Sequence, residues 1–369
     1  MRQLLIVLVS LMAVDVSAAV DISNPMQFMF VGDRKENAID VVSIDDAARV
    51  FRIETSLHPD HIVVTPFAPI LMYVDTASKR AVFYDLKNQV EVKTVDLPLT
   101  PRHVVLDTTG SKVAVSDSVD GGFALVDAYS MDIQFSLPEF PATGPVLFDP
   151  NDVDIYYSNQ ATGSIGMLDV NTQWTYEMPV TQDADDKLSA PSRSLDARYV
   201  YVANVSKGEV YSLNAYSRII FNTFEIGGSP ARPYTTPQGA FLYMVDAANG
   251  RFISVDQHGF EKFAETTFDH SVDLVTVGRF DRMNLFLSSA GPHWSIFDNV
   301  EKKTISTGRF AGTPINALGS ADGKMAYVVF SDLAAIAAVD LEGQTVTYIP
   351  ATDNGSRGFT IGLSNNVCH

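Results

Sequence analysis

The chain has 369 residues, a formal net charge of −18 and 46% apolar residues. An acidic surface repels phosphate groups, which argues against nucleic acid and anionic membrane surfaces as partners. Cys368 is the single cysteine, so a disulfide framework is excluded.

The first 18 residues have the pattern of a secretory signal. They begin with Arg2, continue with an apolar stretch and end with the small residues Ser17 and Ala18. The stretch is too short to span a membrane, and no other long apolar run follows. The sequence therefore predicts a periplasmic or secreted protein without a membrane span.

Short apolar runs separated by turns repeat along the rest of the chain. Residues 101–127 contain three such runs, rich in Val, Ala and Leu, and broken by Gly, Ser and Asp. This is the pattern of short antiparallel strands. The third run ends in Asp or Asn eight times, at spacings of 40 to 45 residues, at Asp45, Asp85, Asp127, Asp169, Asn214, Asp256, Asp298 and Asp340. Four short strands per repeat of this length predict an all-β, eight-bladed β-propeller of four-stranded antiparallel blades.

The two ends of the repeat predict how the ring closes. The first unit begins at Met29 with its second strand, and residues 358–364 have the pattern of the missing innermost strand. Closure removes free sheet edges. We therefore expect a signal peptide at 1–18, a single propeller over 28–364 that the C-terminal strand closes, and a tail at 365–369.

The repeat also sorts the histidines between the two faces of the ring. His61 and His103 occupy equivalent positions at the start of the innermost strands of adjacent blades, and Arg232 occupies the same position four blades further on. His270 lies in a loop across the ring from His103, and His293 in a loop between the second and third strands. All should lie around one channel mouth, which His58, Arg102, Arg193 and Arg357 also flank.

Two interpretations of this mouth remain open. Imidazole is a good ligand for copper, zinc and iron, and arginine binds carboxylates, so the residues predict a site for a metal or an anionic cofactor, with His61 and His103 as the metal ligands. Alternatively, polar residues line the mouth because water fills it. No aspartate completes a Ser–His–Asp arrangement, so hydrolytic chemistry has no support.

The tail, residues 365–369, ends in Cys368 and His369. Covalent haem c needs a second cysteine three positions earlier, where Asn365 stands, so this attachment is excluded. Cys368 could be a reactive thiol in a disordered tail, pair with another chain, or bind a metal together with His369.

Two segments carry a resemblance to a known group. FDPNDVDIYYSN (148–159) and SLDARYVYVAN (194–204) resemble the repeats of YVTN-type bacterial propellers. Eight blades, export and histidines at the mouth are similar to the cytochrome d1 family, which includes the haem-d1 domain of nitrite reductase. The resemblance implies haem d1 as a cofactor. It also implies His61 or His103 as an axial ligand, His270 or His293 as a distal group, and Arg232 as a carboxylate clamp.

Two classes of function follow. One is an exported propeller that binds a redox cofactor or a transition metal such as copper or iron at the mouth, as an accessory protein or an oxidoreductase. The other is a non-catalytic scaffold that binds a protein of the cell envelope. Quinoprotein alcohol dehydrogenases also have eight blades, but this chain lacks their repeated tryptophan motif, since it contains two tryptophans.

Overall fold

The structure is a computed structural model that describes residues 20–362, apart from 182 and 184. The predicted signal peptide and the predicted tail with Cys368 lie outside the described residues. No helix in the described part of the chain has the length and apolar character needed to cross a membrane.

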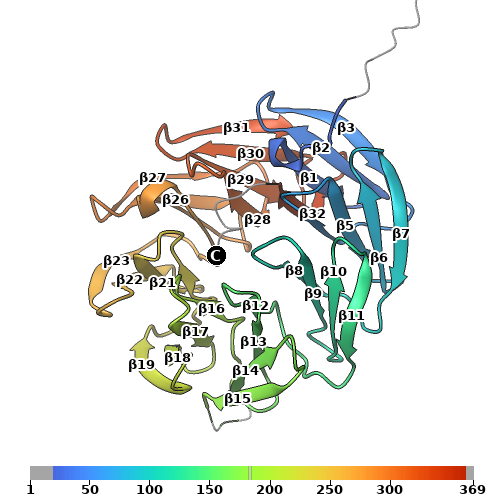
Figure 1. The fold of residues 1–369 in the computed structure, drawn as a ribbon. Coiled ribbons are helices and arrows are strands. Elements are labelled where there is room, and N and C mark those ends of the chain that lie inside the picture. Colours follow the sequence, from blue (N-terminus) through green and yellow to red (C-terminus); the bar gives the residue numbers. More distant parts are fainter. Residues whose placement is uncertain (1–19, 182, 184, 363–369) are drawn as a thin grey trace, which may run out of the picture.

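Eight four-stranded antiparallel sheets form a ring around a central axis (Figure 1). We number these blades 1 to 8 in chain order. Blades 1 to 4 comprise β32 (Ser356–Ile361), β1 (Phe28–Asp33), β2 (Ala38–Ser43) and β3 (Ala48–Glu54); β4 (His61–Val64), β5 (Ile70–Asp75), β6 (Arg80–Asp85) and β7 (Val90–Asp96); β8 (His103–Leu106), β9 (Lys112–Ser116), β10 (Phe123–Asp127) and β11 (Asp132–Leu137); and β12 (Leu147–Phe148), β13 (Asp154–Asn159), β14 (Ser164–Asp169) and β15 (Thr175–Pro179).

Blades 5 to 8 comprise β16 (Ser192–Arg193), β17 (Tyr199–Asn204), β18 (Glu209–Asn214) and β19 (Ile219–Glu225); β20 (Tyr234–Thr235), β21 (Phe241–Asp246), β22 (Arg251–Asp256) and β23 (Lys262–Thr267); β24 (Leu274–Val277), β25 (Met283–Leu287), β26 (His293–Asp298) and β27 (Lys303–Arg309); and β28 (Pro314–Gly319), β29 (Met325–Phe330), β30 (Ala335–Asp340) and β31 (Thr345–Pro350). Two short 3-10 turns, η1 (Pro25–Gln27) and η2 (Arg279–Asp281), complete the described elements. The predicted fold class is confirmed.

The acid that ends the third strand of a blade shapes the next turn. Asp127 Oδ1 accepts hydrogen bonds from the main-chain N–H groups of Tyr129 and Ser130, at 2.9 and 2.7 Å. Such bonds stabilise a turn locally, and Met131 then takes a left-handed conformation with φ 60°. The same pair of bonds forms at Asp85, Asp169, Asn214, Asp298 and Asp340. The sequence repeat is thus a repeat of turn geometry.

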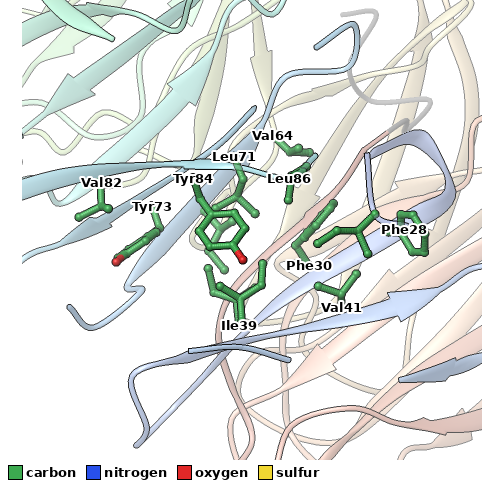
Figure 2. Close-up of a cluster of buried hydrophobic side chains, with 13 residues drawn as sticks. Phe28, Phe30, Ile39, Val41, Val64, Leu71, Tyr73, Val82, Tyr84 and Leu86 are labelled. Carbon is green, nitrogen blue, oxygen red and sulfur yellow. The ribbon is translucent and has the colours of Figure 1, made fainter. Parts of the chain in front are cut away.

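The apolar core lies between the blades. Phe30, Ile39 and Val41 of blade 1 pack against Leu71 and other buried residues of blade 2 (Figure 2). The two middle strands of each blade are almost entirely buried because neighbouring sheets cover both of their faces, whereas the outer strand β7 alternates between exposed and half-buried residues. Each blade therefore depends on both of its neighbours for burial.

The C-terminal strand closes the ring as expected. β32 pairs with β1, with Ile361 opposite Met29 and Phe359 opposite Val31. The two strands lie side by side in Figure 1, although they come from opposite ends of the described chain. Arg52 of β3 contacts Asp40 at 3.1 Å and Asp353, just before β32, at 3.3 Å. Blade 1 is therefore closed by strand pairing, and a network of charged side chains connects β3 to the segment before β32.

Candidate functional site

A cluster of polar side chains lines an open pocket of 420 Å³ at the start of the innermost strands of blades 1 to 3. We call it the mouth pocket. Its lining comprises Asp60, His61, Thr76, Arg102, His103, Ser118 and Arg357. Blade 1 contributes Arg357, and blades 2 and 3 contribute the other residues.

The fold brings the two predicted metal ligands together. His61 is the first residue of β4, and His103 is the first residue of β8. Equivalent positions in neighbouring blades lie side by side around the axis, so a separation of 42 residues in the sequence becomes adjacency in space. The positive charge of a protonated His61 would disfavour protonation of His103, which also indicates that the two rings are close.

Burial disfavours the protonated form of both imidazoles. Loss of hydration is the main cause that lowers the pKa of His61 below its ordinary value, although Asp60 and a hydrogen bond to the main chain of Arg102 oppose it. Burial also lowers the pKa of His103, and a charged His61 or Arg102 would lower it further. A neutral imidazole has a free lone pair on one nitrogen, which is the form that binds a metal.

Two arginines provide positive charge at the pocket wall. Arg102 Nε lies 2.9 Å from Asp117 Oδ1, and Arg357 Nε lies 3.0 Å from Asp60 Oδ1. Both ion pairs use Nε, and both arginine side chains are more than a third exposed. Because a guanidinium has five N–H donors, each arginine can hold its aspartate and still bind an anion.

Asp60 connects several parts of the pocket. Its Oδ2 accepts a hydrogen bond from Thr76 N at 2.8 Å, and His58 Nδ1 lies 3.5 Å from its Oδ1. Arg102 and Arg357 were predicted from the sequence as neighbours of the mouth, whereas Asp60, Thr76 and Ser118 were not. The position of Asp60, immediately before the histidine of the innermost strand, was the available signal.

His270 and His293 form a separate pair. Their rings stack with centroids 5.7 Å apart and an interplanar angle of 15°. His270 Nε2 forms a 2.8 Å hydrogen bond with Ser295 Oγ, in the third strand of blade 7. His293 is the first residue of β26. The sequence had predicted it in the loop before this strand, and that placement is wrong. Neither ring lines the mouth pocket.

Arg232 also lies outside the mouth pocket. Its Nε and Nη2 donate hydrogen bonds to the carbonyl oxygen of Pro191, at 3.0 and 2.7 Å. Its side chain lines two cavities of the central channel, of 330 and 240 Å³. The five predicted site residues therefore fall into three groups: His61 with His103, His270 with His293, and Arg232 in the channel.

The donor set of the mouth pocket favours some ligands over others. Among the described residues, no group of three or more His, Cys, Asp or Glu side chains is placed to hold a metal ion. Two imidazoles and two arginines can instead bind a ligand that carries negative groups and offers one or two positions to nitrogen donors.

Comparison with known proteins identifies the fold. No protein-family model matches the chain, and no curated protein matches it at a significant level. The solved structure of the dihydro-heme d1 dehydrogenase NirN in complex with DHE has a TM-score of 0.77 and 14% identity, covering 94% of this chain and 77% of that chain. This likeness confirms, for the fold, the predicted resemblance to the eight-bladed cytochrome d1-type propeller.

Other propellers are similar over a smaller part of the chain. Kuenenia stuttgartiensis hydrazine synthase has a TM-score of 0.56 and 14% identity, with 80% of this chain and 96% of that chain covered. The β-propeller domain of Myceliophteria thermophila Cps50 (Swd1) has a TM-score of 0.59 and 12% identity, with 80% and 97% covered. At these identities the likeness describes architecture, and activity must be argued from the site.

Proposed function

We propose that this protein is an exported propeller that binds an anionic, metal-bearing macrocycle of the haem d1 type at the mouth pocket, as an accessory protein or an oxidoreductase. The observation that carries the proposal is the pairing of two half-buried imidazoles, His61 and His103, in a pocket that Arg102 and Arg357 also line. Export rests on the signal-like pattern of residues 1–18.

A macrocycle fits this donor set better than a bare ion does. A bare transition metal usually needs three or four protein ligands. A haem-type group supplies the in-plane ligands itself and needs only one or two axial donors from the protein. His61 or His103 would hold the metal of such a group through a ring nitrogen, and the bound group would supply the redox chemistry.

The arginines of the pocket suit the carboxylates of such a group. Arg102 and Arg357 line the pocket, whereas Arg232 lines the channel cavities, so we assign carboxylate recognition to the first two. An arginine–carboxylate contact is both charged and directional. The fold shared with NirN, which was solved in complex with DHE, supports a ligand of this class.

Spectroscopy of the purified protein tests the proposal. The visible spectrum and metal content are recorded first, and the protein is then titrated with iron protohaem and, separately, with Cu²⁺. We expect a bound haem-type spectrum at one equivalent, which the double variant His61→Ala/His103→Ala loses. His258→Ala is the matched control, because this exposed histidine lies in the turn after β22.

A colourless, metal-free protein that binds neither probe, or binds them equally well in the double variant, would refute the cofactor site. Stoichiometric Cu²⁺ binding without haem binding would indicate that the pocket binds a bare metal ion and not a macrocycle. Mass determination of the exported protein tests the localisation, because removal of residues 1–18 is expected.

A second function has one observation in its favour. Trp174, Tyr216 and Phe221 of blades 4 and 5 are more than half exposed. Arg218 stacks over the ring of Tyr176 at 4.3 Å and connects the two blades. Exposed aromatic patches of this kind are typical of protein-binding surfaces. A scaffold role predicts that Trp174→Ala abolishes binding to an envelope partner, while the protein remains colourless and indifferent to the histidine substitutions.

A further inference from the structure

The central channel contains two adjoining cavities that are distinct from the mouth pocket. The larger, of 330 Å³, is lined mainly by the innermost strands of blades 5 to 8, and the smaller, of 240 Å³, by those of blades 1 to 4. Arg232 lines both cavities. A volume of this size lies at the lower end of the range of pockets that hold small molecules.

Arg232 carries a positive charge that the described residues do not neutralise. Nε and Nη2 bind the carbonyl oxygen of Pro191, and no carboxylate in the described part of the chain forms an ion pair with this guanidinium. The residue is exposed to solvent within the channel, and its guanidinium keeps N–H donors that Pro191 does not use, so it can bind an anion.

The neighbouring polar groups of the larger cavity are mostly donors. Ser192 is 6% exposed, and its Oγ has no hydrogen-bond partner. Asn316 Oδ1 already accepts from Ala317 N at 2.8 Å, so the NH2 group is what its amide can offer a ligand. A buried hydroxyl without a partner costs free energy, and a ligand that accepts its hydrogen bond recovers that cost.

Two further charged residues line the same cavity. Arg193 is buried, its Nε donates to the carbonyl oxygen of Phe148 at 3.0 Å, and the charges of Asp149 and Asp152 act on its guanidinium. Asp273 is exposed and accepts a 2.7 Å hydrogen bond from Ser289 N. Arg193 and Arg232 both keep N–H donors for a ligand, and Arg232 is the more accessible of the two.

The rest of the wall is apolar. Leu147, Val245, Leu274, Val275, Ala317 and Leu318 contribute to it. An inorganic oxyanion would leave this surface without a contact, whereas an organic acid would place its hydrocarbon part there and its charge at Arg232.

We propose that the larger channel cavity is a binding site for a small organic carboxylate, whose carboxylate pairs with Arg232 and accepts a hydrogen bond from Ser192. This inference does not depend on the cofactor proposed for the mouth pocket. The ligand class follows from guanidinium groups without a carboxylate partner, a buried hydroxyl donor and an apolar wall.

Calorimetric titration with benzoate, acetate and sulfate at constant ionic strength tests the site. We expect saturable 1:1 binding of benzoate, weaker binding of acetate and weaker binding of sulfate. Arg232→Gln should weaken benzoate binding at least about tenfold, since a charge-assisted contact is lost. Arg198→Gln is the matched control, because this arginine is 58% exposed and lines neither channel cavity.

A second variant tests the same site with a smaller risk of misfolding. Ser192→Ala removes a hydroxyl that has no protein partner, so the fold should tolerate it, and benzoate should bind about fivefold more weakly. The variant His61→Ala/His103→Ala should bind benzoate like the wild type, which separates this site from the mouth pocket.

The absence of saturable binding by any of the three anions would overturn the proposal, as would equal losses in Arg198→Gln and Arg232→Gln. Sulfate binding as tight as benzoate binding would overturn the assignment to an organic ligand. Loss of benzoate binding in the double histidine variant would show that the anion binds at the mouth and not in the channel.

Discussion

Asp40 gives the sharpest test of how the ring closes. Its carboxylate is completely buried, and it contacts Arg52 at 3.1 Å and Arg49 at 3.4 Å. Loss of hydration outweighs the attraction of both arginines and raises the pKa of Asp40 from 3.8 to about 6. The attraction is still present, since it helps to raise the pKa of the less buried Arg52.

The raised pKa makes stability depend on pH. Between about pH 4 and pH 6 the folded protein binds a proton at Asp40 that the unfolded chain has released, so the contribution of this group is fully present below pH 4 and is lost as the pH rises through 6. At about 1.4 kcal/mol per pH unit, the loss in the free energy of unfolding is about 3 kcal/mol.

Urea unfolding of the wild type and Asp40→Asn at pH 4, 5, 6 and 7 measures this effect. Asparagine cannot ionise. We therefore expect the free energy of unfolding of the variant to rise by about 3 kcal/mol relative to that of the wild type between the lowest and the highest pH. Asp353→Asn is the control, because this carboxylate contacts the same two arginines but is 59% exposed. The difference in the free energy of unfolding between this variant and the wild type should therefore change less with pH.

Parallel stability curves for the wild type and Asp40→Asn, within the error of the extrapolation, would refute the reasoning. Parallel curves would mean that the arginines compensate fully for burial, so that ionised Asp40 neither stabilises nor destabilises the fold. A difference of the opposite sign would mean that the arginines outweigh burial and that the charge network stabilises the closing blade at neutral pH.

Three further results are expected. Gly166→Ala would place its Cβ 1.9 Å from the ring of Tyr157 and should cost at least about 2 kcal/mol of stability by urea unfolding, whereas Gly144→Ala, with nothing within 4 Å, should be neutral. NMR titration of His103 should give a midpoint below the ordinary imidazole value of 6.5, and a higher midpoint would contradict the burial argument. Phe359→Ala should cost about 3–5 kcal/mol, because this side chain of the closing strand is 7% exposed; a negligible loss would argue against tight closure.

Much of the fold follows from local chemistry and could be predicted from the sequence. The Asp and Asn residues that end the third strands mark turns, because their side chains accept hydrogen bonds from the main-chain N–H groups two and three positions further on, as at Asp127. The adjacency of His61 and His103 followed from the repeat, since equivalent positions in neighbouring blades meet around the axis. The missing first strand of blade 1 likewise predicted its pairing with β32.

The candidate site was less predictable because it depends on side-chain directions and on burial. A position in the repeat assigns a residue to a strand end but does not say where a long side chain goes, so Arg232 was expected at the mouth and instead lines the channel cavities. The stacking of His270 on His293 and the ion pairs of Arg102 and Arg357 also depend on packing between loops.

By itself, then, the sequence determined the number of blades, their strand order and the closing strand, because hydrogen-bonded turns and two-residue alternation are local properties. The tertiary structure decided which imidazoles lose water, which guanidinium groups find a carboxylate and which do not. These outcomes depend on distances and dielectric surroundings that exist only after separate blades have packed around a common axis.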